Sequence, residues 1–212
     1  MALKFKTVKA HESNYGSKRE TSNIKYIVVH YTGNKGDTAL NNCKYFQGAD
    51  RHASAHYFID GGEYVYISVP TNIIAWAVGG KYSTSNGAGS FYGKCTNANS
   101  ISIELCDSVS SVPDATYKQL VELVKYLMDK YNIPASKVIR HWDVNGKQCP
   151  APWVGKNNKA WEKFKKDIVA EEKTEEFKVG DYNDCVIIAK DCPIRKGRGK
   201  KYKKIGSYHG LF

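Results

Sequence analysis

The sequence predicts an α/β fold in which helices flank a single central mixed β-sheet, followed by a small β-rich C-terminal segment. Apolar runs typical of buried strands occupy 24–29 (IKYIVV) and 100–106 (SISIELC). Amphipathic stretches at 114–131 and 158–168 have the apolar spacing of helices. Strands that alternate with helices along a chain favour one sheet covered by helices.

The elements expected before residue 79 are short. They are a strand at 24–29, a helix at 37–46, and a β-hairpin whose two strands lie at 54–60 and 63–69. The strand is apolar and β-branched, and it runs directly into His30. The hairpin is indicated by two β-type runs on either side of Gly61-Gly62, which permit a tight turn.

Residues 79–99 are rich in Gly, Ser and Asn and predict a long loop, a kind of segment that often carries function. A strand at 100–106 and a helix at 114–131 follow. After them we expect a strand at 137–140 and a last helix at 158–168. In the first of these strands, Glu104 lies on the face opposite to the isoleucines. Asp114 is the expected N-cap of the long helix, and the strand at 137–140 leads to His141.

The length is enough for one full domain with a small addition. We expect the main domain over 1–168, a charged linker over 169–177, and a separate β-rich segment over 178–212, where the composition turns basic and glycine-rich.

The chain is strongly basic, with 32 Lys and Arg against 21 Asp and Glu and a formal net charge of +11. This charge indicates an anionic partner: nucleic acid, a membrane surface, or a polymer such as a bacterial wall. The sequence has no basic motif with interleaved aromatics and no apolar run of membrane length, so we expect neither nucleic acid nor membrane. The first residues lack the apolar core of a signal peptide, so we expect synthesis in a cytoplasm.

Three residues have the chemistry of a metal site: His30, His141 and Cys149. Two imidazoles and a thiolate are a ligand set that a catalytic zinc uses when one position stays open. The chain has no C-x-x-C pair, which argues against a zinc ribbon or finger. Taken singly, each ligand has an ordinary alternative, because strand histidines are usually core residues and loop cysteines are usually inert.

Four segments resemble, in order, the motifs of the type-2 N-acetylmuramoyl-L-alanine amidases. This superfamily includes phage endolysins, bacterial autolysins and peptidoglycan recognition proteins. The segments are VVHYTG, SAHYFID, NSISIEL and RHWDVNGKQCPAP. The resemblance covers about residues 20–168, and phage endolysins of Gram-positive hosts look most similar. It implies hydrolysis of the amide between N-acetylmuramic acid and L-alanine in peptidoglycan.

The resemblance also implies one Zn²⁺ ion, held by His30, His141 and Cys149. Such an ion lowers the pKa of water to about 7 and so supplies a nucleophile at neutral pH. Glu104 is implied as general base; its alternative is a buried carboxylate paired with an arginine such as Arg140.

Lys147 is implied as the residue that stabilises the tetrahedral oxyanion. It stands two residues before Cys149, and its ordinary alternative is an exposed loop lysine.

Substrate contacts are expected from His56 and Trp76. Ala55 stands where one branch of the family has a tyrosine, which groups this chain with the branch that uses a glutamate. As a strand histidine, His56 could equally support the fold. Many relatives read Trp-His-x-Gly where this chain has Trp76-Ala77-Val78-Gly79, and the alternative for Trp76 is core packing.

The C-terminal segment resembles the start of a bacterial SH3-type wall-binding module, through IRKGRGKKYKKIG. This resemblance implies that the segment binds the wall, or that it self-associates through open sheet edges. The alternative is a basic tail without a fold.

Two other functions compete with the amidase: a peptidoglycan-binding protein of the same fold without catalysis, and another zinc hydrolase. The second is disfavoured because the H-E-x-x-H and deaminase signatures are absent. Without a signal peptide, release to the wall is expected to depend on a holin.

Overall fold

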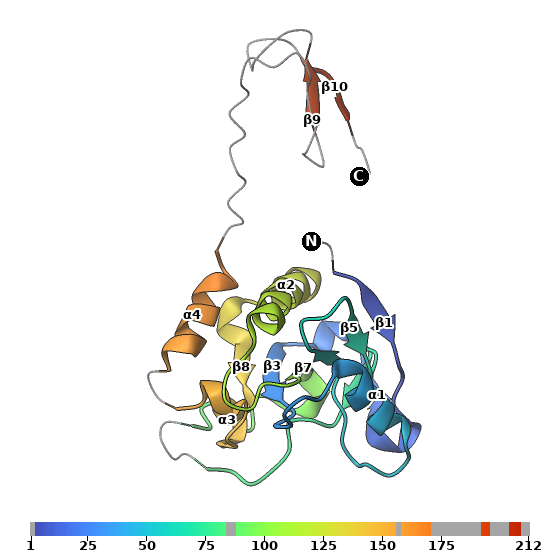
Figure 1. Ribbon diagram of the computed structural model, residues 1–212, viewed down its shortest axis with the longest axis vertical. Helices are drawn as coiled ribbons and strands as arrows, with labels where there is room; N and C mark the ends of the chain where they lie inside the picture. The colour runs from blue at the N-terminus through green and yellow to red at the C-terminus, as the bar shows by residue number, and fades with distance from the viewer. Residues whose placement is uncertain (1–2, 84–87, 156–157, 171–191, 196–203, 209–212) are drawn as a thin grey trace. The chain divides into compact units, whose positions relative to one another are not determined.

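The computed structural model describes residues 3–83, 88–155, 158–170, 192–195 and 204–208 (Figure 1). The chain divides into two compact units, Met1–Glu171 and Glu172–Phe212. In the second unit the described residues form two antiparallel strands, β9 (Cys192–Arg195) and β10 (Lys204–Tyr208). The rest of the predicted SH3-like segment, and most of the predicted linker, lie outside the described residues.

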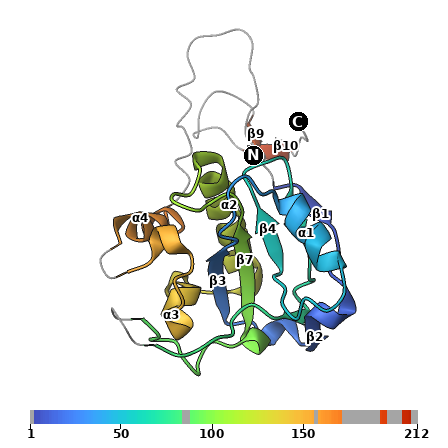
Figure 2. The ribbon, with the colours of Figure 1, turned by 60° about the horizontal axis from the view of Figure 1, so that its bottom comes forward.

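The first unit is built on a six-stranded sheet. Its strands, in spatial order, are β1 (Phe5–Thr7), β5 (Val65–Ile67), β4 (Tyr57–Ile59), β7 (Ser100–Leu105), β3 (Tyr26–Tyr31) and β8 (Val138–Arg140). Strands β4, β7, β3 and β8 run parallel, whereas β5 is antiparallel to β4 and β1 is parallel to β5. The sheet is therefore mixed, as predicted, and Figure 2 shows β3, β7 and β4 side by side in the middle of this unit.

Among the described residues, four α-helices accompany the sheet: α1 (Ala39–Gln47), α2 (Asp114–Tyr131), α3 (His141–Asn145) and α4 (Lys159–Asp167). Short 3-10 helices lie at Glu12–Asn14, Thr21–Asn23, Asn97–Asn99, Ala135–Lys137 and Ala151–Trp153. A separate pair of antiparallel strands joins β2 (Tyr15–Lys18) to β6 (Ile73–Ala75). None of the described helices is long and apolar enough to cross a membrane.

One face of the sheet packs against α2 and α4. Val29 of β3 and Ile103 of β7 are fully buried there, against Leu123 of α2 and Phe164 of α4. Full burial of a side chain of this size contributes about 1.5–3 kcal/mol. The apolar stripe predicted for α2 is therefore the main contact that closes this side of the core.

The alternate residues of the same strands point to the opposite face. Phe58 of β4 packs there with Cys43 of α1, and Val28 of β3 packs with Val144 of α3. In register, Glu104 of β7 lies between Phe58 and His30. Polar side chains thus stand on this face between two small apolar clusters.

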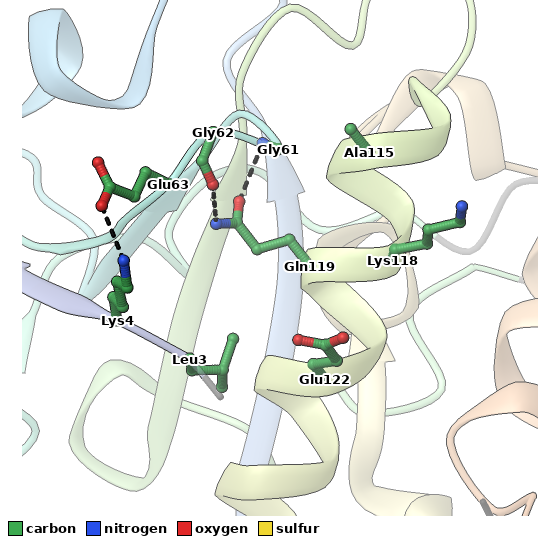
Figure 3. Close-up of a pocket in the computed structure, with 9 residues that line it drawn as sticks. All are labelled: Leu3, Lys4, Gly61, Gly62, Glu63, Ala115, Lys118, Gln119 and Glu122. Atoms are coloured by element: carbon green, nitrogen blue, oxygen red, sulfur yellow. Dashed lines mark hydrogen bonds and ion pairs between the residues drawn. The ribbon is translucent and has the colours of Figure 1, made fainter. Parts of the chain in front are cut away.

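A polar contact holds α2 against the turn between β4 and β5. Gln119 accepts a hydrogen bond from the Gly61 amide at 2.9 Å and donates one to the Gly62 carbonyl at 3.0 Å (Figure 3). Gly61 has a φ of +78°, and an added Cβ would lie 2.5 Å from a backbone nitrogen of α2, so only glycine fits. Lys4 and Glu63 form an ion pair beside this turn.

The structure differs from the sequence predictions at three kinds of position. Strands β1, β2 and β6 were not predicted, because each is short and β1 is exposed along its length. Asp114 is the first residue of α2 rather than its N-cap, which is Pro113. Helix α3, which begins at His141 directly after the predicted strand, was not predicted.

Candidate metal centre and active site

Three side chains from distant parts of the chain meet at one edge of the sheet. His30 lies near the end of β3, and His141 begins α3 directly after β8, the parallel neighbour of β3. Cys149 follows in the next loop. One ligand atom of each residue lies within 4.8 Å of the other two, and all three side chains are buried. The structure thus brings together the three predicted metal ligands.

The nitrogens of this trio have lone pairs available for a metal. His141 Nε2 is 3.0 Å from the Gly79 carbonyl oxygen, so this nitrogen carries the proton and Nδ1 does not. His141 Nδ1 and His30 Nε2 are buried without a hydrogen-bond partner among the described residues. His30 Nδ1 lies 3.7 Å from Cys149 Sγ. A tetrahedral zinc site separates nitrogen and sulfur ligands by about 3.5 Å, so these residues fit a zinc ion.

Burial sets the protonation of the trio. It lowers the pKa of His30 well below its ordinary value and that of His141 to about 4, with Lys147 acting in the same direction. Burial also raises the pKa of the Cys149 thiol to about 12, and the neighbouring Glu104 adds to this rise. Both imidazoles are therefore neutral and ready to bind a cation, whereas the thiol must lose its proton first.

Glu104 stands beside the trio. Its register partner on β3 is His30, and its Oε2 atom is buried without a hydrogen-bond partner among the described residues. Burial raises the pKa of Glu104 to about 7, while Lys147 lowers it and Asp37 raises it. A carboxyl group that titrates near neutral pH can both accept and return a proton.

The alternative that pairs Glu104 with Arg140 is wrong. Arg140 donates to both carboxylate oxygens of Asp143, from Nη2 at 2.8 Å and from Nε at 3.0 Å. It also donates to the Trp153 carbonyl at 2.5 Å and lies 4.5 Å from the ring of Trp142. This buried pair fixes the start of α3, the helix that carries His141.

Lys147 is exposed in the loop between α3 and Cys149, and with Glu104 it lines the same cavity. Its positive charge lowers the pKa of His30, His141, Cys149 and Glu104 alike. The ammonium group therefore acts on every ionisable member of the site.

The cavity beside this cluster has a volume of about 480 Å³. It lies between the end of β3, helix α1, Glu104 and Lys147. Its other walls are mixed polar and aromatic: Tyr31, Thr32, Asn34, Asp37, Asn41, Asn42, Tyr45, Phe46 and Phe58. A cavity of this size and character can accept part of a peptide or a sugar.

His56 is fully buried and makes contacts within the fold. Its Nδ1 accepts a hydrogen bond from the Ser102 amide at 3.0 Å, and its Nε2 lies 3.1 Å from the Ile73 carbonyl. Burial and the nearby Arg19 guanidinium lower its pKa to about 3, so the ring is neutral. The ring thus bridges β7 and β6 within the fold, and a contact between His56 and substrate stays a prediction.

Trp76 follows β6 and is partly buried. Its amide donates to Ser54 Oγ at 3.0 Å, and a Cβ added to Gly16 of β2 would lie 3.0 Å from its Nε1. It is not among the residues that line the 480 Å³ cavity. Its contact with substrate stays a prediction.

The sequence profile of the Amidase_2 family, N-acetylmuramoyl-L-alanine amidase, matches residues 20–152, which is more than half of the chain. The chain belongs to this amidase family. The matched range contains the three candidate ligands, Glu104 and Lys147. It ends before residue 178, so the predicted SH3-like segment lies outside it.

Curated relatives of this amidase-family chain come from Bacillus. N-acetylmuramoyl-L-alanine amidase CwlL of Bacillus licheniformis is 36% identical over 137 residues, or 62% of this chain and 37% of CwlL. BlyA of Bacillus subtilis strain 168, also an N-acetylmuramoyl-L-alanine amidase, is 33% identical over 143 residues, or 64% of this chain and 39% of BlyA. The match therefore spans less than half the length of either relative.

Solved structures, one of them an endolysin, share the fold. A mutant endolysin from Bacillus subtilis superimposes with a TM-score of 0.62 at 26% identity, covering 79% of this chain and 99% of the endolysin. The PlyG catalytic domain superimposes with a TM-score of 0.60 at 31% identity, covering 79% of this chain and 93% of the domain. The central sheet with flanking helices is thus the fold of this family.

Two groups of this amidase-family site were missed by sequence reasoning. The Gly79 carbonyl accepts hydrogen bonds from His141 Nε2 at 3.0 Å and from Asn145 Nδ2 at 2.6 Å. A backbone carbonyl leaves no signal in the sequence. Asn145 did leave one, because it follows His141 by four residues and so shares its face of a helix.

Proposed function

We propose that this chain hydrolyses the amide bond between N-acetylmuramic acid and L-alanine in bacterial peptidoglycan, and so lyses the wall as an endolysin does. One observation carries the proposal: a buried His-His-Cys trio lies beside Glu104, and within the described part of the chain two of its nitrogens and Glu104 Oε2 have no hydrogen-bond partner. Membership of the amidase family and the names of its Bacillus relatives support the same reaction.

We assign one Zn²⁺ ion to His30, His141 and Cys149. When bound there, zinc would polarise the substrate carbonyl and lower the pKa of a water molecule toward neutrality. The protein provides two neutral imidazoles for this ion, and burial of all three side chains keeps bulk water from competing for it.

Glu104 moves the proton. Its Oε2 accepts a proton from the attacking water and then delivers it to the departing nitrogen of L-alanine, which leaves as a free amine. The other product is the carboxylate of the lactyl group. A positioned carboxylate in this role is worth about 10²–10⁴-fold in rate, and the raised pKa of Glu104, about 7, suits both transfers.

Lys147 stabilises the developing charge. Its ammonium group borders the cavity next to Glu104, where the carbonyl oxygen of a bound substrate becomes negative in the tetrahedral state. A cation already in place beside that oxygen lowers the barrier without reorganising solvent.

We further propose that residues 178–212 bind the peptidoglycan wall as part of an SH3-like module. Their excess of lysine and arginine supports attraction to an anionic wall. Pull-down on insoluble walls checks this: charge reversal of Lys200, Lys201 and Lys203 to glutamate should lower the bound fraction. Unchanged wall binding together with a concentration-dependent mass in light scattering would favour self-association instead.

The amidase proposal is tested with the full chain and its Cys149→Ser variant. We expect about one zinc per wild-type chain, lysis of purified walls, and products that carry a free L-alanine amino terminus and a free lactyl carboxyl group in mass spectra. The variant should lose both zinc and lysis. A wild type without zinc, or a variant that lyses walls fully, would falsify the proposal.

Two other results of this experiment identify the competing functions. Binding to walls without new amino termini would indicate a non-catalytic peptidoglycan-binding protein. Cleavage within the stem peptide would indicate a zinc peptidase rather than an amidase.

A further inference from the structure

Asn145 is the last residue of α3 and lies one turn after His141 on the same helix. Its side chain is only 2% exposed, although it sits at the end of a short helix next to a loop. A buried amide must satisfy its donors and its acceptor within the protein, so its partners show what it holds in place.

The amide nitrogen of Asn145 holds a carbonyl that also orients a candidate metal ligand. Asn145 Nδ2 donates to the Gly79 oxygen at 2.6 Å, and His141 Nε2 donates to the same oxygen at 3.0 Å. The bond from His141 fixes which of its two nitrogens is left free. Asn145 therefore fixes the position of the acceptor on which the orientation of the His141 ring depends.

The amide oxygen of Asn145 holds the other side of the site. Asn145 Oδ1 accepts a hydrogen bond from the Lys147 amide at 3.0 Å, and the Lys147 carbonyl accepts one from the Cys149 amide at 2.7 Å. Because one end of the side chain must donate and the other must accept, the orientation of the amide is unambiguous.

The surrounding backbone is shaped around this side chain. A Cβ added to Gly80, whose φ is +123°, would lie 3.0 Å from Asn145 Nδ2. Gly146 has a φ of +84°, and an added Cβ would lie 2.4 Å from the Ser83 carbonyl oxygen. The Ser83 amide in turn donates to the Asn145 carbonyl at 2.8 Å. Two glycines thus allow the loop at 79–83 to close onto Asn145.

We infer that Asn145 is a positioning residue that fixes the metal-binding orientation of His141 and the placement of Lys147 through the two ends of one amide. This inference rests on the proposed function, because it concerns zinc binding and turnover at that site. It assigns the two positioning roles to different atoms of Asn145: Nδ2 orients His141, and Oδ1 places Lys147.

Two substitutions separate the atoms. Asn145→Asp keeps an acceptor for the Lys147 amide but removes the donor to Gly79, whereas Asn145→Ala removes both. Asn14→Asp is a matched control, because Asn14 is equally buried and also uses both ends of its amide, donating to the Phe46 carbonyl at 2.8 Å and accepting from the Arg51 amide at 2.7 Å.

Zinc affinity is the first measurement, by competition with a chelator. Both Asn145 variants should bind zinc about 10–100-fold more weakly than wild type, the effect of losing a group that orients a metal ligand. At saturating zinc, Asn145→Ala should also lower kcat roughly tenfold with little change in KM, because a misplaced catalytic group is costly. Asn145→Asp should lower kcat less than Asn145→Ala does, because it keeps the acceptor for the Lys147 amide, and Asn14→Asp should leave zinc affinity unchanged.

The second measurement uses the metal-free protein, so that the inference and the proposed function fail separately. The ¹⁵N shifts of His141 should show Nε2 protonated in wild type and a mixture of tautomers in both Asn145 variants. If wild type binds no zinc but the His141 tautomers still differ between wild type and the Asn145 variants, only the proposed function is contradicted. Unaltered tautomers with wild-type zinc affinity, or equal losses in Asn14→Asp, overturn the inference. Should either variant not fold, Asn145→Ser, which lacks both ends of the amide, replaces it with the expectations stated for Asn145→Ala.

Discussion

His30 and Glu104 occupy the same register position on the adjacent parallel strands β3 and β7. Neighbouring strands lie about 4.8 Å apart, so the two side chains project side by side from one face of the sheet. The backbone of the sheet alone therefore sets the spacing between the first candidate ligand and the candidate base.

Substituting the candidate base tests this arrangement. Glu104→Gln keeps the shape of the side chain but cannot accept the proton, so kcat for amide hydrolysis should fall about 10²–10⁴-fold. Zinc content should stay at the wild-type level, because Glu104 is not a ligand. Steady-state kinetics on muropeptides and metal analysis measure the two quantities. A variant with near wild-type kcat would remove Glu104 from the mechanism.

The pH profile should report the protonation of Glu104. Its pKa is raised to about 7, and only the deprotonated form can act as a base, so kcat/KM should rise with pH through about 7. Because Lys147 lowers the pKa of Glu104, Lys147→Met should lower kcat and move the rising limb to higher pH. Lys118→Met serves as control, because Lys118 lies on α2 beside the Gly61–Gly62 turn (Figure 3) and does not line the cavity that Glu104 and Lys147 share. If the rising limb of kcat/KM lies at the same pH in Lys147→Met as in wild type, the electrostatic coupling between Lys147 and Glu104 is contradicted.

Zinc binding should release at least one proton at neutral pH. Burial raises the pKa of Cys149 to about 12, so the thiol must lose a proton, whereas His141, with a pKa of about 4, is already neutral. Zinc affinity should therefore increase about tenfold per pH unit around pH 7. Calorimetry in buffers of different ionisation enthalpy counts the protons. Zero proton release would exclude Cys149 as a ligand.

His56 should make the fold sensitive to acid. Its pKa is about 3 in the folded state and about 6.5 when unfolded, so the unfolded state binds the extra proton first. The free energy of unfolding should fall as pH drops from about 6.5 toward 3. His56→Gln should be less stable overall but should show a shallower decline of Tm over that range. His11→Gln, at an exposed position, is the control. An equal decline of Tm with falling pH in wild type and in His56→Gln would contradict the prediction.

Breaking the buried pair under α3 should destabilise the fold. Asp143→Asn leaves the Arg140 guanidinium buried without its carboxylate, which typically costs about 3–5 kcal/mol. Urea denaturation measures the change. Glu63→Gln, which breaks the exposed pair with Lys4, should have little effect and is the control. Equal stability of the two variants would show that the buried pair adds nothing.

The sequence was most informative where side-chain chemistry and periodicity agree. The stripe of α2 and the alternation of β7 predict burial correctly, because local spacing determines which face meets the core. The two candidate histidines were found because each directly follows a predicted strand, and Cys149 was found because its thiol completes their ligand set eight residues after His141. Chemistry of this kind is local and can be read from one segment.

The remaining features depend on contacts between distant segments. The register that sets His30 beside Glu104 arises from long-range strand pairing, which local patterns do not encode. Burial of His56 depends on Arg19 and Ile73, which are far from it in the sequence. The exposed strand β1 has no apolar alternation to identify it, since only its pairing with β5 makes it a strand.

The separation of the ligands along the chain has a consequence for synthesis. Cys149 follows His30 by 119 residues and comes after β8, the last strand of the sheet to be made. A growing polypeptide on the ribosome therefore lacks a complete ligand set until nearly all of this unit has been translated. A product of termination before Cys149 would therefore lack the third candidate ligand, and the metal site proposed here could not form in it.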